Sequence, residues 1–426
     1  MAALCTPFLA AQSRDTTVLK QVIIFGRHAA RTPVVPASTL NTFSALPFPT
    51  FAVSGQAAIT PNGRTNETIL GNYFRLWLSQ EKLLTGNDNA DAAYLYVRAD
   101  NAPLMVDTAQ AFAEGLLPAA RTTVNTVPGA DPLFDPIDAG VAKLDGNMAI
   151  AAVNGRLGGN PQSLATAYAA EFALARSVLF DYPLATSPAP AAPAGKIDIT
   201  AIPITLTAGN ATAPVNPGGL GSFYYAIDPL IMEYVDGMPA SDVGWGQLDA
   251  AGISQVFRVY DALLDLEFRT PYLAKVQSSN LASHIVRTML QSATGASMGG
   301  TVGTPSDRIV LLTATNTNVT GLAGLLNLDW LVSGYQRDVA SLGGALVFEL
   351  RQSQRTGEFI VRAVYVAQTM DQLRNRTPLT LAAPPAKVPV FIPGCSIDNA
   401  TFDCPLGTFV RVVQQQIDPK SVDLNN

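Results

Sequence analysis

The stretch Val18-Leu-Lys-Gln-Val-Ile-Ile-Phe25 is followed, after one glycine, by Arg27-His28-Ala29-Ala30-Arg31-Thr32-Pro33. The first eight residues are rich in β-branched side chains and almost continuously apolar, which predicts a buried strand in a sheet that is covered on both faces. The polar residues after it then lie at the carboxyl end of that strand. Layered α/β folds bind their ligands outside this end of the strands, so we expect the candidate site here.

Strand and helix patterns alternate along much of the chain, which predicts an α/β layered domain. Thr60, before Pro61, is a plausible helix N-cap. The expected helices cover Glu67–Leu78, Val106–Gly115 and Asn280–Gln291. The expected strands cover Ala93–Val97 and Arg308–Thr313, and a hairpin joins Ala345–Leu350 to Phe359–Val366.

The middle of the chain has a different pattern. From about Asp135 it consists of Ala-rich helical stretches, interrupted by a Pro/Ala/Gly segment near Ser187–Gly195 that is typical of a loop. We therefore predict a discontinuous α/β core domain, residues 1–134 and 252–426, with a mainly helical cap domain, residues 135–251, inserted into it.

Composition excludes several classes of protein. A chain of 426 residues that is 48% hydrophobic and 14% charged is not disordered. It has no apolar run near the roughly 18 residues of a membrane span, and its net charge of -6 argues against nucleic acid as a partner. With two histidines, His28 and His284, it has no material for a His-rich metal site. We expect a small-molecule substrate, no metal and no organic cofactor; the oligomeric state stays open.

The cysteines and the glycosylation acceptor patterns bear on the compartment. Cys395 and Cys404 enclose a short polar loop and are expected to form a disulfide, whereas Cys5 has no obvious partner. Five Asn-x-Ser/Thr patterns favour a secreted glycoprotein over an intracellular protein. They begin at Asn66, Asn210, Asn318, Asn375 and Asn399.

The motif after the first strand carries the chemistry. Arg27 and Arg31 can hold an oxyanion by forked hydrogen bonds while the imidazole of His28 attacks or exchanges protons. The alternative is that His28 is a core histidine between two solvated arginines, but its place at a strand end favours the chemical role. His284, on an amphipathic helix far from the motif, is expected to be structural.

With this motif the sequence resembles the histidine acid phosphatases, the branch of the histidine phosphatase superfamily that includes the phytases. That family carries Arg-His-Gly-x-Arg-x-Pro after its first strand, and only the glycine differs here, replaced by Ala29. The resemblance implies a large α/β domain with a helical cap, an active cleft between them, an extracytoplasmic location and the Cys395–Cys404 bridge. Further similar blocks are Thr60–Gly63, Ala109–Leu116, Asp131–Asp135, Gly237–Pro239 with Gly244-Trp245, Arg269–Pro271, Gly343–Glu349 and Gln368–Gln372.

The catalytic positions depart from that family. In it the histidine forms a phosphohistidine, an arginine after the second strand binds the phosphate, and a distal His-Asp pair supplies a phosphate contact and the leaving-group proton. Here Leu104 stands in place of the arginine, and Thr315 and Asn316 replace the His-Asp pair. Each lost charge-assisted hydrogen bond is worth about 1.5–3 kcal/mol, and a missing general acid costs about 10²–10⁴ in rate.

We therefore expect an enzyme of this fold that has lost phosphate-ester hydrolysis. It would perform acid/base chemistry, such as isomerisation, cyclisation or elimination, on a neutral, partly apolar small metabolite. His28 would exchange protons while Arg27 and Arg31 hold a carbonyl, enolate or carboxylate. The expected substrate contacts are Arg98, Asp100, Leu104, Tyr224, Tyr225, Thr315 and Asn316.

Two alternatives stay open. One is a residual acid phosphomonoesterase that works through a phosphohistidine at His28, with Asp100, Asp107 or Glu114 as the substitute acid. The other is a catalytically silent small-molecule-binding protein. In either case the cap, with four basic and eleven acidic residues between 135 and 250, would repel a polyphosphorylated substrate.

Overall fold

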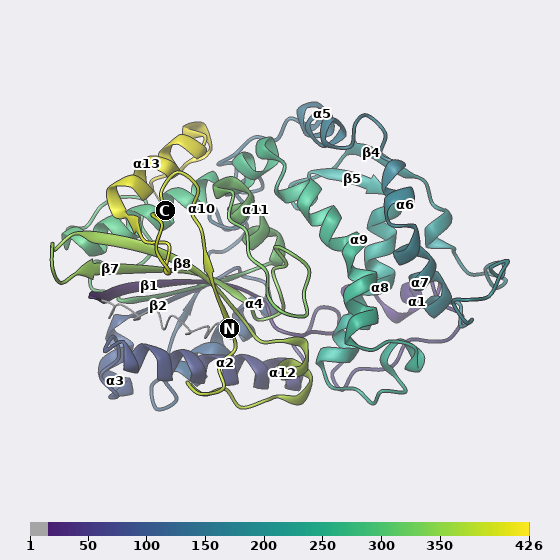
Figure 1. Ribbon diagram of the computed structural model, residues 1–426, viewed down its shortest axis with the longest axis horizontal. Coiled ribbons are helices and arrows are strands. Elements are labelled where there is room, and N and C mark those ends of the chain that lie inside the picture. The colour runs from purple at the N-terminus through teal and green to yellow at the C-terminus, as the bar shows by residue number, and fades with distance from the viewer. Residues whose placement is uncertain (1–15, 426) are drawn as a thin grey trace, which may run out of the picture.

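The computed structural model describes residues 16–425, so Cys5 lies outside the described residues. Its centre is a mixed sheet of eight strands, the α/β architecture expected from the sequence (Figure 1). In spatial order the strands are β10 (Cys404–Pro405), β8 (Phe359–Ala367), β7 (Ala345–Ser353), β1 (Thr17–Arg27), β6 (Ile309–Ala314), β2 (Leu95–Ala99) and β3 (Val124–Asn125); β9 (Ala386–Val390) also pairs with β8.

The sheet is parallel on one side of β1 and antiparallel on the other. β1, β6, β2 and β3 are parallel, so their carboxyl ends meet at one edge. β7 and β8 form the predicted hairpin, which is antiparallel to β1. The parallel half therefore places the residues after β1, β2 and β6 close together.

Helices cover both faces of the sheet (Figure 1). Successive side chains of β1 point to opposite faces, since Val22 and Ile24 belong to one hydrophobic cluster and Ile23 and Phe25 to the other. One face is covered by α2 (Pro61–Gln80) and α4 (Pro103–Leu116), with the short α3 (Asp88–Asp91) beside them. The other is covered by α10 (Pro271–Thr294), α11 (Asn316–Leu326) and α13 (Leu406–Gln416).

A second group of elements lies beside the sheet and its helices (Figure 1). Its helices α7, α8 and α9 share one hydrophobic cluster, which includes Phe223, Ile227 and Val256. Helix α9 crosses residue 252, where we expected the cap to end, and the division into domains stays a prediction. The elements are α1 (Ala37–Leu40), α5 (Gly146–Arg156), α6 (Ser163–Ala167), α7 (Ala169–Leu179), the hairpin β4 (Ile204–Ala208) and β5 (Val215–Gly218), α8 (Gly219–Val235) and α9 (Ala250–Phe268).

Most predicted elements are present, with shifted ends. Thr60 is the N-cap of α2, and its side chain accepts a hydrogen bond from the Gly63 N–H. β2 begins two residues later than expected because a 3₁₀ turn occupies 92–94. α10 extends well beyond the expected Asn280–Gln291, since buried polar residues such as Ser278 and His284 interrupt its apolar periodicity. The short α12 (Met370–Asn375) was not expected.

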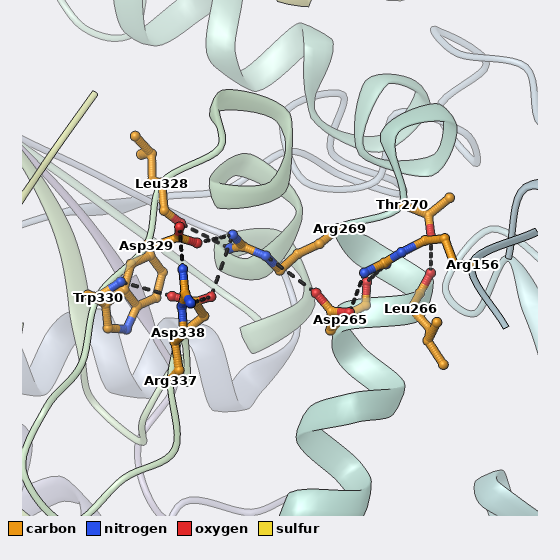
Figure 2. A network of polar contacts seen from close by, with 10 residues as sticks. All are labelled: Arg156, Asp265, Leu266, Arg269, Thr270, Leu328, Asp329, Trp330, Arg337 and Asp338. Carbon is orange, nitrogen blue, oxygen red and sulfur yellow. Dashed lines mark hydrogen bonds and ion pairs between the residues drawn. The ribbon is translucent and has the colours of Figure 1, made fainter. Parts of the chain in front are cut away.

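An ion-pair network joins the two groups of elements where α9 ends and α10 begins (Figure 2). Arg269 lies between carboxylates from both sides, at 2.7 Å from Asp329 and 3.6 Å from Asp265 and from Asp338. Arg156, on α5, donates to the other side of Asp265. A shared network of this kind fixes the angle between α9 and the core helices better than any one exposed pair could.

The expected disulfide between Cys395 and Cys404 is present, with 5.1 Å between the two Cα atoms. Disulfides of this kind persist in oxidising compartments, which agrees with the secretory route, although the route itself stays a prediction. Asn66 is buried and its amide donates to Leu373 O, so this acceptor pattern cannot carry a glycan in the folded protein. None of the helices within residues 16–425 has the length and apolar character that a membrane crossing requires.

Candidate active site

Parallel pairing of β1 with β6 brings together the residues that follow these two strands, and both groups belong to the candidate site. Arg27, the last residue of β1, pairs with Ala314, the last residue of β6. The next residue, His28, donates its backbone N–H to Ala314 O at 3.1 Å. His28 and Thr315 therefore leave the sheet side by side, although 286 residues separate them in the sequence.

The imidazole of His28 is held in one orientation. Its Nδ1 lies 2.8 Å from the backbone oxygen of Ala29, which can only accept, so Nδ1 carries the proton and Nε2 has a free lone pair. Burial lowers the pKa of His28 well below its usual value, and the charges of Arg27 and Arg31 lower it further. The ring therefore stays neutral into acidic solution, which suits a nucleophile.

The loop after β1 is packed closely under the first turn of α2. A Cβ atom on Gly63 would lie 2.3 Å from Ala30 O, so the Thr60-Pro61-x-Gly63 block permits this close approach. Ala29 replaces the glycine of the resembling family without a left-handed backbone, since its φ is not positive. Its N–H donates to the Thr108 hydroxyl of α4.

A cavity of about 310 Å³ opens over His28. It brings together six of the residues expected at the site, namely His28, Arg31, Leu104, Tyr224, Thr315 and Asn316. Its wall is largely apolar. The remaining lining residues are Val34, Ala57, Met105, Phe134, Asp135, Pro136, Ile137, Ala211, Thr212, Tyr260, Gln277, Thr317 and Asn318.

The two arginines of the motif have different surroundings. Arg31 lines the cavity and donates to both carboxylate oxygens of Asp228, on α8, at 2.8 and 2.9 Å. It also lies 3.2 Å from the Tyr224 hydroxyl. Arg27 borders a neighbouring small cavity instead and donates to Ala340 O at 2.7 Å, while its buried Nε has no hydrogen-bond partner.

The three substituted positions all face the cavity. Leu104 lies in the first turn of α4 and is buried. Thr315 is the N-cap of α11, and its hydroxyl lies 2.6 Å from both Thr317 Oγ1 and Asn318 Oδ1. Asn316 donates to the Tyr260 hydroxyl at 2.9 Å. The matching of these positions by motif therefore places them around His28.

Three expected contact residues lie outside the cavity. Arg98 forms a two-pronged ion pair with Asp131, at 2.9 and 2.6 Å, that holds the loop after β3. Asp100 accepts from the Ala102 N–H and so shapes the turn before α4. Tyr225 is 42% exposed and touches the cavity only through its ring contact with Tyr224. The structure thus does not bring these three residues into the cavity over His28, and their role as substrate contacts stays a prediction.

Two of the lining residues that were not expected at the site carry groups that bear on its chemistry. Tyr260, on α9, stacks on Tyr224 with ring centres 4.2 Å apart. Asp135 is the last residue of Asp131–Asp135, one of the blocks similar to the histidine acid phosphatases. This similarity was the signal in the sequence that could have pointed to Asp135. Burial raises the pKa of Asp135 to about 6, and the nearby carboxylates of Asp100, Asp138 and Asp131 contribute. Within residues 16–425 no cluster of three or more His, Cys, Asp or Glu side chains could hold a metal ion.

The fold and the Arg-His motif define a phosphatase-type α/β protein, and comparisons agree. Residues 18–164 match the histidine phosphatase superfamily (branch 2). Phytase AppA of Escherichia coli (strain K12) is 27% identical, with 97% of this chain and 98% of the relative covered. Glucose-1-phosphatase of Providencia rettgeri is 25% identical, with 94% and 92% covered. The chain is therefore similar to proteins of the histidine phosphatase superfamily over nearly its whole length.

Solved structures show the same likeness. The Hafnia alvei phytase in complex with tartrate has a TM-score of 0.83 and 29% identity, with 96% of this chain and 100% of that chain covered. The Citrobacter braakii phytase has a TM-score of 0.84 and 25% identity, with 95% and 99% covered. The described fold is thus that of the phytases.

The prediction of a repurposed isomerase, cyclase or lyase is wrong. The relatives that align over nearly the whole chain are phytases and glucose-1-phosphatases, so the findings favour an enzyme of the phosphatase type. Charged groups are missing at three positions around His28, but the tertiary structure brings other groups there, above all Asp135 and the amino ends of two helices.

Proposed function

We propose that this protein hydrolyses phosphomonoesters through a phosphohistidine at His28. The observation that carries this proposal is the hydrogen bond from His28 Nδ1 to Ala29 O at the floor of the cavity. It leaves Nε2 as an unprotonated nucleophile, and the lowered pKa keeps it so at acidic pH. A buried, neutral and oriented imidazole is what attack on phosphorus requires.

Phosphate binding in this cavity is supported by groups other than the missing arginine. The first turns of α4 and α11 both line the cavity, through Leu104 and Met105 and through Thr317 and Asn318. The amino end of a helix carries about half a positive charge and unpaired N–H groups, which favour an anion. Arg31 adds a guanidinium that Asp228 holds in place.

The lining of the cavity also bears on the substrate. Among the described residues that line it, Arg31 is the only arginine or lysine, and about half of the others are apolar. A second and third phosphate would find no further cation there. We therefore propose a substrate with a single phosphate on a neutral, partly apolar alcohol. The solved complex with myo-inositol hexakis sulphate is a property of the Hafnia alvei phytase.

The test is hydrolysis of 4-nitrophenyl phosphate between pH 3 and pH 8. The chain offers a matched control, because His284 is buried and its Nδ1 also lies close to a backbone oxygen, that of Asn280. We expect turnover in the wild type and in His284→Gln, and none in His28→Ala. Quenching during turnover in alkaline detergent should trap an alkali-stable, acid-labile phosphoryl group on the wild type and on His284→Gln, and none on His28→Ala.

Two results would overturn this proposal. Turnover that survives His28→Ala would show that another group attacks phosphorus. A folded wild type without turnover, which binds the ester equally well after His28→Ala, would leave the silent binding protein as the better description.

A further inference from the structure

Phosphate-ester hydrolysis at His28 needs a proton for the departing alcohol oxygen, and the substituted positions cannot supply it. Asn316 presents an amide, which is not an acid at any relevant pH, and its Nδ2 already donates to Tyr260. The Thr315 hydroxyl caps α11 through Asn318. A proton donor must therefore come from elsewhere in the cavity.

Asp135 has the required position. It carries the only carboxyl group among the described residues that line the cavity over His28. Its backbone N–H donates to Asp131 O at 2.6 Å, and the preceding Phe134 O accepts from Asn318 Nδ2 at 2.7 Å. These bonds tie the Asp135 segment to the first turn of α11, the helix that begins beside His28.

The three acids that the sequence suggests as substitutes, Asp100, Asp107 and Glu114, do not reach this cavity. Asp107 is exposed on α4, and Asp100 is engaged in its own turn. Glu114 forms an ion pair with Arg64 at 2.7 Å. None of the three lines the cavity.

The charges around Asp135 favour its protonated form. Asp100, Asp131 and Asp138 raise its pKa together with burial. The guanidinium of Arg98 is engaged by Asp131, on the same segment as Asp135.

The cavity is also lined by His28, which is neutral, and by Arg31, whose guanidinium is ion-paired with Asp228. The pKa of Asp135 of about 6 leaves a proton available in mildly acidic solution.

We propose that Asp135 is the general acid that protonates the leaving group, in place of the aspartate that Asn316 replaces. This inference rests on the proposed phosphatase function. In the first step the lone pair of His28 Nε2 forms an N–P bond, and the ester P–O bond breaks. Its electron pair leaves with the alcohol oxygen, which takes the proton of Asp135.

In the second step the same residue acts in reverse. Water attacks phosphorus and gives one proton to the Asp135 carboxylate, while the N–P electron pair returns to His28 Nε2. Inorganic phosphate leaves, and both side chains are restored. The proton on His28 Nδ1 stays on that nitrogen throughout and is donated to Ala29 O.

A leaving-group comparison tests this role. Asp135→Asn should lower kcat for an alkyl phosphate by about 10²–10⁴, the usual contribution of a general acid. Its loss on 2,4-dinitrophenyl phosphate should be much smaller, because that leaving group needs no proton. Asp107→Asn removes the same charge from an exposed position outside the cavity that does not act on the pKa of Asp135, so it is the matched control and should behave as wild type.

The pH profile supplies a second readout. The wild type should lose kcat for the alkyl ester as the pH rises through about 6, where Asp135 loses its proton. Asp135→Asn should lack this limb, and Asp107→Asn should keep it. A structural role of Asp135 would lower kcat on both esters alike and leave the limb in place.

The outcomes separate the two proposals. If His28→Ala is inactive on both esters but Asp135→Asn loses equally on both, or loses nothing, the phosphatase stands and the general acid is another group. If His28→Ala is as active as the wild type, the phosphohistidine itself is wrong.

Discussion

Arg31 and Asp228 form a two-pronged, almost fully buried ion pair between the motif after β1 and helix α8. The two guanidinium nitrogens lie 2.8 and 2.9 Å from the two carboxylate oxygens, and both side chains are at most 3% exposed. Arg31 thus lines the cavity as a cation and also connects the motif to helix α8 through its ion pair with Asp228. The orientation of Arg31 is set from outside its own segment.

Removal of Asp228 should be costly because it leaves the Arg31 charge buried and unpaired. We expect Asp228→Ala to lower the free energy of unfolding by about 3–5 kcal/mol in urea titrations. The matched control is Glu114→Ala, which breaks the half-exposed pair with Arg64 and should cost less than about 1 kcal/mol. Equal losses in the two variants would show that the buried pair has no special weight.

Arginine at position 104 should strengthen phosphate binding. Leu104→Arg places a guanidinium in the first turn of α4, facing the cavity. One new charge-assisted hydrogen bond of about 1.5–3 kcal/mol corresponds to a roughly 10- to 150-fold lower inhibition constant for inorganic phosphate.

Gln110→Arg adds the same charge on the same helix outside the cavity, so it should leave the inhibition constant for phosphate nearly unchanged. Adding Thr315→His and Asn316→Asp to Leu104→Arg should raise kcat/KM for 4-nitrophenyl phosphate further. No gain from the triple variant would mean that these positions do not limit the reaction.

The stability of the protein should rise as the pH falls from 8 to 6.5. Burial raises the pKa values of Glu67, Glu233 and Glu267 to about 8 each. In the unfolded chain these carboxyls ionise near pH 4.5, so between the two values unfolding releases protons and acid favours the folded state. His28, whose pKa is lowered, opposes this trend only below its unfolded value of about 6.5.

The melting temperature, measured across this window, checks the sign. Glu267→Gln should flatten the pH dependence, because the amide cannot take up a proton. The same change at Glu358, which is exposed in the turn between β7 and β8, should leave it unchanged. A melting temperature that falls from pH 8 to pH 6.5 would contradict the assignment of these groups as buried acids.

The disulfide should stabilise the protein without affecting catalysis. Its two cysteines are separated by nine positions in the sequence. For a loop of this length, loop-closure entropy predicts that the disulfide stabilises the folded state by about 2–3 kcal/mol. Replacing both Cys395 and Cys404 by serine should lower the free energy of unfolding by that amount. Turnover should be retained, because β8 and β7 lie between β10 and β1. A loss of turnover in a folded double variant would contradict this separation.

Local sequence determined the helices and strands whose patterns depend only on near neighbours in the chain. The β-branched run before Arg27 specifies a buried strand, and Thr60-Pro61 specifies the start of α2, because strand burial and helix capping depend on near neighbours. α10 was underestimated for the corresponding reason. Its buried polar residues are compatible with a helix only through partners such as Pro132 O, which accepts from Asn280, and these lie far away in sequence.

The sequence by itself determined the fold, the motif around His28, and which positions depart from the histidine phosphatases. Only the tertiary structure decided which groups meet in the cavity. Parallel pairing of β1 with β6 sets Thr315 beside His28, and the bond from Asn318 to Phe134 O brings in Asp135. The strand and helix patterns are local, whereas the cavity is made of residues whose contacts span up to hundreds of positions. Asp135 could therefore be seen as a candidate acid only once the chain was folded.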